Sequence, residues 1–209
     1  MERLTPSGLT GGLDTAYLGN LTQQVDHITN AGAHAIVCPH NYGRFNGDIV
    51  TSTADFQTWW DNVGTVYKAN SLVIFDTNNE YHDMAGSLVA SLKQAAINGI
   101  RNAGATSQYI TAEGNAYTGA WTTATATGTT DGEVKADLSG KVAHLLNCVS
   151  ANNVFPRCIK YLDSDGSGTY DTCVNSTIGL DRLKAATAWL RSNNKQGLLG
   201  EYAGAVNSV

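Results

Sequence analysis

The stretch at 72–80, LVIFDTNNE, limits what this chain can fold into more than any other. It begins with four apolar or aromatic residues, Leu72 to Phe75, and ends in a polar cluster that includes Asn79 and Glu80. A short continuous apolar run is typical of a strand buried on both faces, as in a parallel sheet. Polar residues after such strands form the active sites of α/β barrels. We therefore expect Glu80 to be a carboxylate at the mouth of a barrel; the alternative is that the cluster only caps the next helix.

Four other segments also have an apolar run followed by polar residues, and amphipathic helices separate most of the runs. The expected strands cover 35–38, 72–75, 108–112, 158–162 and 197–200. N-caps at Asp14 and at Ser52 or Thr53 are expected to begin two of the helices. Alternating strands and helices predict a parallel sheet with helices outside it. Polar clusters after nearly every strand favour a (β/α)8 TIM barrel over a doubly wound sheet, where only the switch point carries a site.

The chain is short for a barrel of this kind. It has 209 residues, whereas such barrels run to about 250 residues. Besides the five full strands, Glu2–Leu4 resembles the end of one more. We therefore expect one partial barrel domain over 1–209, with the first strand, most of the second and the eighth strand missing.

Residues 131–159 are an atypical segment of this expected domain. The apolar residues of 134–149 are spaced so that they would share one face of a helix. Pro156 and Arg157 stand where a central strand is expected, and proline is disfavoured there because it lacks a donor for the sheet. One hypothesis is that the segment is non-native sequence, for example a translated intron.

Composition excludes several classes of partner. The net charge of -5 disfavours nucleic acid or an anionic membrane surface, and no apolar run approaches the roughly 18 residues of a membrane span. The four cysteines show no CxxC spacing, and the loop at 163–168 departs from calcium-loop spacing, so we expect no metal and no cofactor. Glycosylation sequons at Asn20 and Asn175 give weak support for a secreted protein.

Two glutamates, Glu80 and Glu201, each follow an expected buried strand. Three strand positions separate them, so they would face each other across the barrel mouth. Paired carboxylates are what cleavage of a glycosidic bond needs, because one donates a proton and the other attacks or activates water. Aromatic residues near strand ends would offer flat platforms for sugar rings. These are Tyr42, Phe45, Tyr117 and Trp121; the alternative for each is ordinary packing.

Five motifs together resemble glycoside hydrolase family 5, the fungal endo-β-1,4-glucanases. They are PHNYGRF at 39–45, LVIFDTNNEYHDM at 72–84, AEGNAYTGAW at 112–121, KYLDSDGSGT at 160–169 and GLLGEYAG at 197–204. The resemblance covers most of the chain except about 131–159. It implies a secreted, extracellular (β/α)8 barrel that hydrolyses internal β-1,4 bonds of cellulose with retention of configuration and without a cofactor.

The resemblance also assigns roles to residues. Glu80 would be the general acid/base and Glu201 the nucleophile. Asn79 would bind the sugar 2-hydroxyl, and Tyr161 would lie against the nucleophile. The remaining substrate-binding residues would be His40, Asn41, Tyr42, Tyr117 and Trp121.

One departure from the family pattern weakens the assignment. Ile159 stands two residues before Tyr161, where the family has a histidine, and an aliphatic side chain cannot hydrogen-bond. Two alternatives therefore stay open beside a monomeric endoglucanase acting on cellulose or a related β-glucan. One is a family 5 hydrolase of mannan or xylan, and the other is a truncated, impaired barrel that at most binds glucan.

Overall fold

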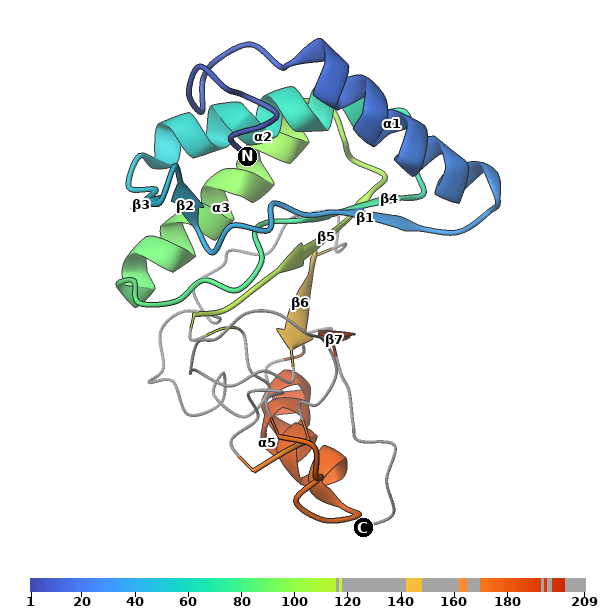
Figure 1. Ribbon diagram of the computed structural model, residues 1–209, viewed down its shortest axis with the longest axis vertical. Helices are drawn as coiled ribbons and strands as arrows, with labels where there is room; N and C mark the ends of the chain where they lie inside the picture. The colour runs from blue at the N-terminus through green and yellow to red at the C-terminus, as the bar shows by residue number, and fades with distance from the viewer. Residues whose placement is uncertain are drawn as a thin grey trace.

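A five-stranded parallel sheet with the order β1-β4-β5-β6-β7 organises the computed structural model (Figure 1). The structure describes residues 1–115, 117, 142–147, 162–164, 170–192, 194 and 197–201, with backbone alone for 142–147, 189 and 201. The strands are β1 (Ala35–Val37), β4 (Val73–Asp76), β5 (Tyr109–Ala112), β6 (Val142–Asn147) and β7 (Gly197–Glu201). The expectation of parallel strands alternating with helices is confirmed.

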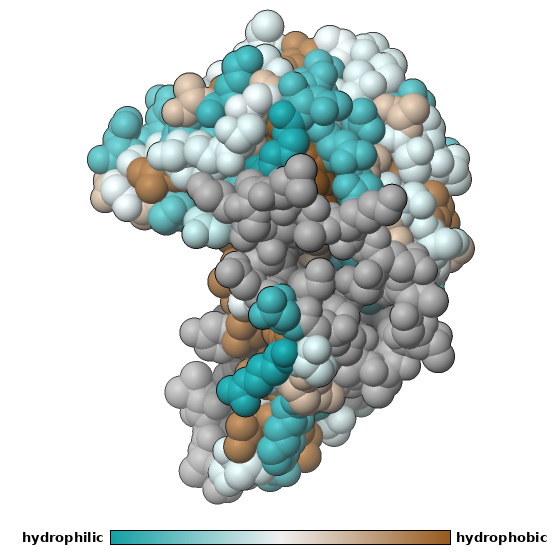
Figure 2. All heavy atoms as spheres, turned by 180° about the vertical axis from the view of Figure 1, so that it is seen from behind, coloured by the Kyte–Doolittle hydropathy of each residue, from teal (hydrophilic) through white to brown (hydrophobic). Residues whose placement is uncertain are grey.

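Four helices are described: α1 (Thr15–Asn30), α2 (Thr53–Tyr67), α3 (Gly86–Asn102) and α5 (Ile178–Ser192). The side chains of Asp14 and Ser52 accept hydrogen bonds from the first turns of α1 and α2, at 2.7 and 3.2 Å, as expected of N-caps. Helices α1, α2 and α3 lie together on one side of the sheet, and α5 lies beyond β7 (Figure 1). Seen from behind, the described upper part of the molecule shows hydrophilic and intermediate residues with scattered hydrophobic ones (Figure 2).

The two faces of the sheet differ in what covers them. Val37, Val73 and Phe75 belong to the apolar core that the helices cover. Because successive side chains of a strand point to opposite faces, Ile36 and Tyr109 lie on the other face. The register places Ile36 beside Ile74, and Ile74 beside Tyr109. Ile36 is 49% and Tyr109 45% exposed, so this apolar row is left open to solvent.

Helices α2 and α3 cross at two glycines. A Cβ atom on Gly99 would lie 2.3 Å from the carbonyl oxygen of Gln57, and one on Gly64 would lie 2.9 Å from the Cβ of Ala103. Only residues without a side chain allow this approach. The close crossing fixes both helices against β4 and β5, which carry the candidate site.

A two-residue turn closes a short antiparallel hairpin, β2 (Arg44–Phe45) with β3 (Asp48–Ile49). Asn46 and Gly47 both have positive φ, 53° and 90°. An Asn-Gly pair is favoured in hairpin turns of this type because both central residues must be left-handed.

Two sequence predictions need correction. Glu2–Leu4 forms a turn, closed by the Leu4 amide donating to the Met1 carbonyl at 2.9 Å, and is not the end of a strand. Residues 142–147 form β6, so the helix spacing of 134–149 was misleading there. β6 occupies the place between β5 and β7 that we expected for 158–162, of which 158–161 lie outside the described residues.

Candidate active site

The polar segment after β4 forms the centre of the candidate site. Thr77 donates its backbone N–H to the Thr111 carbonyl at 3.0 Å, and Asn79 donates its own to the Pro39 carbonyl at 3.1 Å. These two hydrogen bonds hold the segment that contains Glu80 against the ends of β5 and β1. Glu80 is 8% exposed and has a φ of 52°, a left-handed conformation that is uncommon for a residue with a side chain.

The predicted residues after β1 lie beside this segment. The Asn79 side-chain nitrogen Nδ2 lies 3.4 Å from His40 Nε2. The His40 ring packs edge to face against Tyr42, with a centroid distance of 5.8 Å. Asn41 donates its side-chain amide to the Arg44 carbonyl, which holds the start of the hairpin. The structure thus brings His40, Tyr42 and Asn79 together, and their substrate-binding roles stay predictions.

A cluster of rings and charges borders Glu80 on its other side. His82 stacks on Tyr117 with centroids 4.3 Å apart, packs against Tyr42 at 5.2 Å, and lies 3.4 Å from the Arg44 guanidinium. Burial, then the charges of Asp83 and Glu80, raises the pKa of Tyr117. Tyr117 is only 8% exposed. The prediction of an exposed sugar platform is therefore wrong for Tyr117, because His82 covers its ring.

A buried polar layer lies directly beneath Glu80, and the sequence did not reveal it. Asp76 is 1% exposed and accepts hydrogen bonds from the Cys38 thiol at 2.9 Å and the Thr111 hydroxyl at 3.1 Å. Glu113, which is fully buried, also hydrogen-bonds the Asp76 carboxyl. Burial raises the pKa of Asp76 to about 6, against the lowering effect of these hydrogen bonds. A carboxyl in this layer therefore keeps its proton at mildly acidic pH.

Period-two alternation was the signal that could have found this layer. Cys38 follows Ile36 by two residues, Asp76 follows Ile74, and Thr111 follows Tyr109. All three therefore project from the face opposite the helices. Locating the layer also needs the register between strands, which local patterns do not give.

The second predicted carboxylate belongs to the same edge of the sheet. Glu201 is the last residue of β7, and β5 and β6 separate β7 from β4, so the predicted three-position spacing is confirmed. Carboxyl ends of parallel strands share one edge, which places the Glu201 backbone on the same side as Glu80. The Glu201 side chain, Trp121 and Tyr161 lie outside the described residues, so their roles stay predictions.

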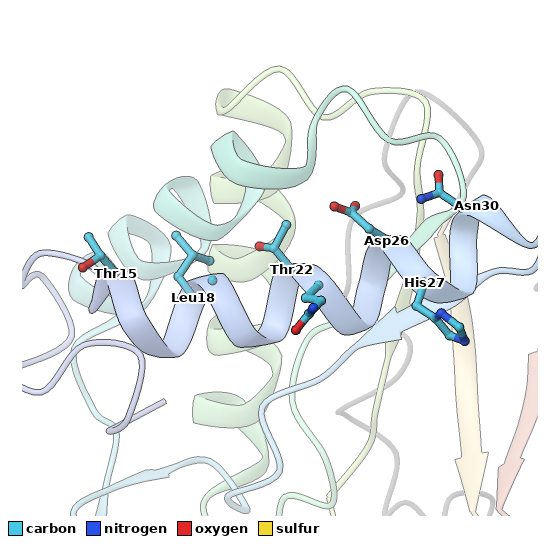
Figure 3. Close-up of a pocket in the computed structure, with 8 residues that line it drawn as sticks. Thr15, Leu18, Thr22, Asp26, His27 and Asn30 are labelled. Atoms are coloured by element: carbon cyan, nitrogen blue, oxygen red, sulfur yellow. The ribbon is translucent and has the colours of Figure 1, made fainter.

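Other surfaces do not coincide with this edge. A shallow pocket runs along α1, and Thr15, Leu18, Thr22, Asp26, His27 and Asn30 line it (Figure 3). It includes none of the predicted site residues.

Within the described ranges, no group of three or more His, Cys, Asp and Glu side chains has a geometry suited to a metal ion. No described helix is both long and apolar enough to cross a bilayer.

Comparison with known proteins decides the family. The sequence matches the family described as Cellulase (glycosyl hydrolase family 5) over residues 1–209. The chain belongs to glycosyl hydrolase family 5. It is 53% identical to a probable endo-β-1,4-glucanase B of Aspergillus kawachii and 52% identical to the endo-β-1,4-glucanase B of Aspergillus niger, over its whole length in both cases. It spans 59% of the length of each of these relatives.

Solved family 5 structures have the same arrangement of helices and strands. An endo-β-1,4-glucanase of Xanthomonas axonopodis pv. citri superposes with a TM-score of 0.87 at 30% identity, covering all of this chain and 64% of that one. Cel5A of Hypocrea jecorina superposes with a TM-score of 0.82 at 30% identity, over 97% of this chain and 60% of that one.

Proposed function

We propose that the protein containing this family 5 chain is an endo-β-1,4-glucanase that hydrolyses internal bonds of cellulose or a related β-glucan. One observation carries the proposal: Glu80 is buried at the carboxyl end of β4, beside Asn79 and His40, while Glu201 ends β7 at the same edge. Relatives at 52% identity are named endo-β-1,4-glucanases. XacCel5A, which is 29% identical to this chain, has been solved in complex with cellopentaose, and this supports a glucan substrate.

The proposed reaction retains the configuration of the sugar. Glu201 attacks the anomeric carbon while Glu80 gives its proton to the leaving oxygen, which breaks the glycosidic bond and leaves a glycosyl ester on Glu201. Glu80 then takes a proton from water, and that water displaces Glu201 and restores both carboxyl groups. Asn79 would hold the 2-hydroxyl of the sugar, and His40 would line the subsite where cleavage occurs. This chemistry uses protein groups alone and no cofactor.

We also propose that the sheet is part of a (β/α)8 barrel whose first strand, most of the second and the eighth lie outside these 209 residues. The open apolar row of Ile36, Ile74 and Tyr109 supports this, because inward-facing layers of apolar side chains fill such barrels. β1 and β7 each form an edge of the described sheet. Further strands paired to these edges would cover the row and remove two unpaired borders.

A secreted monomer is the form we propose. Both sequons are accessible, since Asn20 on α1 and Asn175 before α5 are exposed. A glycan at either position would lie on the outer helical side of the sheet or beyond β7, away from Glu80.

The test compares β-glucan with the alternative polysaccharides. The longest protein that the source transcript encodes around this chain would be assayed for reducing-sugar release from carboxymethylcellulose, mannan and xylan. We expect release from carboxymethylcellulose, and loss of about 100-fold or more in Glu80→Gln, because general acid catalysis contributes about 10²–10⁴-fold. Asp26→Asn, an exposed carboxylate on α1, is the matched control and should keep full activity.

Each other outcome is informative. If the protein hydrolyses mannan or xylan faster than carboxymethylcellulose, the proposed mechanism would stand but the proposed substrate would be wrong. A folded protein that releases sugar from none of the three would refute the proposed enzyme and favour a glucan-binding or impaired barrel.

A further inference from the structure

We infer that Glu113 is a positioning residue for the general acid/base: its buried carboxylate at the end of β5 holds the Glu80 backbone in the conformation that catalysis needs. The inference rests on the proposed function of Glu80. It assigns a role to a side chain that does not itself contact the expected position of the substrate.

The central observation is a hydrogen bond between the two residues. The Glu80 backbone N–H donates to Glu113 Oε2 at 2.5 Å. Hydrogen bonds to an ionised carboxylate are shorter and stronger than those between neutral groups. Both residues are buried, Glu113 completely, so water cannot easily replace this acceptor.

Glu80 needs such a hold because its conformation is unfavourable in isolation. Its φ of 52° is left-handed, and a non-glycine residue keeps such a conformation only where its surroundings impose it. The backbone on both sides of Glu80 is held as well: the Asn79 amide donates to the Pro39 carbonyl, and the Tyr81 carbonyl accepts from the Tyr117 amide at 3.0 Å. The Asn78 side-chain amide donates to the carbonyl of the Asn79–Glu80 peptide at 2.7 Å, and the Glu113 contact fixes the N–H of the same peptide. It therefore sets the direction in which the Glu80 side chain leaves the backbone.

The buried polar layer holds the Glu113 carboxyl group in place through its contact with Asp76. Two carboxyl groups in hydrogen-bond contact cannot both be ionised at low cost, so Asp76 and Glu113 share one proton. Glu113 accepts from the Glu80 amide through Oε2, while the Cys38 thiol and the Thr111 hydroxyl donate to Asp76.

The decisive variants differ in one property, the ability to accept a hydrogen bond. Glu113→Gln keeps an oxygen that can accept from the Glu80 amide, and Glu113→Met has a similar volume without such an acceptor. Both would be made in the longest protein that the transcript encodes around this chain. Urea unfolding would show whether each variant is folded.

Leaving-group dependence separates positioning from a structural role. A general acid matters most when the leaving group is a poor one, such as a sugar, and little when it is 2,4-dinitrophenolate. We expect kcat/KM of folded Glu113→Met to fall about 10- to 100-fold on cellopentaose but less than about threefold on a 2,4-dinitrophenyl cellooligosaccharide. Glu113→Gln should stay within about threefold of the parent on both substrates. An equal loss on both substrates in folded Glu113→Met would overturn the inference.

A measurement independent of activity keeps the test decisive. The Glu80 amide proton should resonate far downfield in the parent, because the contact is short, and its resonance should move in Glu113→Gln, because the acceptor changes from a carboxyl to an amide oxygen. If Glu113→Met does not fold, this shift and the activity of Glu113→Gln decide; an unmoved amide would overturn the inference. A parent that hydrolyses neither substrate would instead refute the proposed function, and the amide shift would still test the contact itself.

Discussion

Replacing Gly99 with alanine should show how far the site depends on the crossing of α2 and α3. The new Cβ would lie 2.3 Å from the Gln57 carbonyl oxygen and 3.0 Å from the Asp61 amide nitrogen, both backbone atoms that no rotamer change can move. Because real Cβ contacts essentially never fall below 3.0 Å, the helices must separate by at least about 0.7 Å. Overpacking of this kind costs about 1–3 kcal/mol or more.

A glycine without such neighbours supplies the matched control. Gly19 lies inside α1, and a Cβ there would meet nothing within 4 Å. Alanine is favoured over glycine in a helix by about 1 kcal/mol, so Gly19→Ala should stabilise the protein by up to that amount. Gly99→Ala gains the same propensity, so its net loss of stability should be up to about 2 kcal/mol.

The assay is urea unfolding of both variants and the parent, followed by tryptophan fluorescence. Trp59 and Trp60 lie on α2, so they report on the layer that must move. Equal or greater stability of Gly99→Ala compared with Gly19→Ala would refute the reasoning, because it would mean that the two helices do not approach as closely as described.

Three further predictions concern the carboxyl groups. Burial raises the pKa of Asp76 from 3.8 to about 6, so its stabilising contribution is complete below pH 3.8 and is lost as pH rises through 6. In urea titrations, the free energy of unfolding of the parent should fall by at most about 3 kcal/mol between pH 4 and pH 8 because Asp76 ionises. Asp76→Asn should not show this fall, and an unchanged pH profile in the variant would contradict the prediction. In a crystal structure of the whole protein, the Glu80 and Glu201 carboxyl groups should lie about 5–5.5 Å apart, and a gap above roughly 12 Å would exclude the pair. Carboxyl titration by NMR should find the higher pKa on Glu80, because it must carry a proton while Glu201 is ionised; the reverse order would exchange the two roles.

Local sequence patterns predicted those features of the candidate site that depend only on residues close together in the chain. The apolar run of β4 followed by Asn79 and Glu80 predicted both the strand and the sheet edge at which the candidate site lies. The helix caps were equally local, because a cap depends only on a side chain and the next three residues.

Features that depend on contacts between distant segments were missed. Glu113 looked like one more polar residue after a strand, and only its contacts with Asp76 and Glu80 distinguish it. Tyr117 was expected to be an exposed aromatic because it lies near the end of a strand, yet His82, 35 residues earlier, stacks on its ring. Burial and register belong to the packed sheet, so no window along the chain contains them.

β6 gives the sharpest disagreement between sequence and structure. The sequence suggests that 131–159 is foreign to the fold, whereas Val142–Asn147 pairs with β5 at Ile110 and with β7 at Gly197. The two interpretations differ in what Leu145→Pro should do. In a central strand, proline removes a ladder donor and leaves the acceptor on the neighbouring strand unpaired, which costs about 1–3 kcal/mol before any steric clash. We therefore expect the urea midpoint of Leu145→Pro to fall, in line with a loss of about 1–3 kcal/mol in the free energy of unfolding. An unchanged midpoint would mean that β6 adds nothing to the folded sheet, and the non-native interpretation of 131–159 would then be the better one.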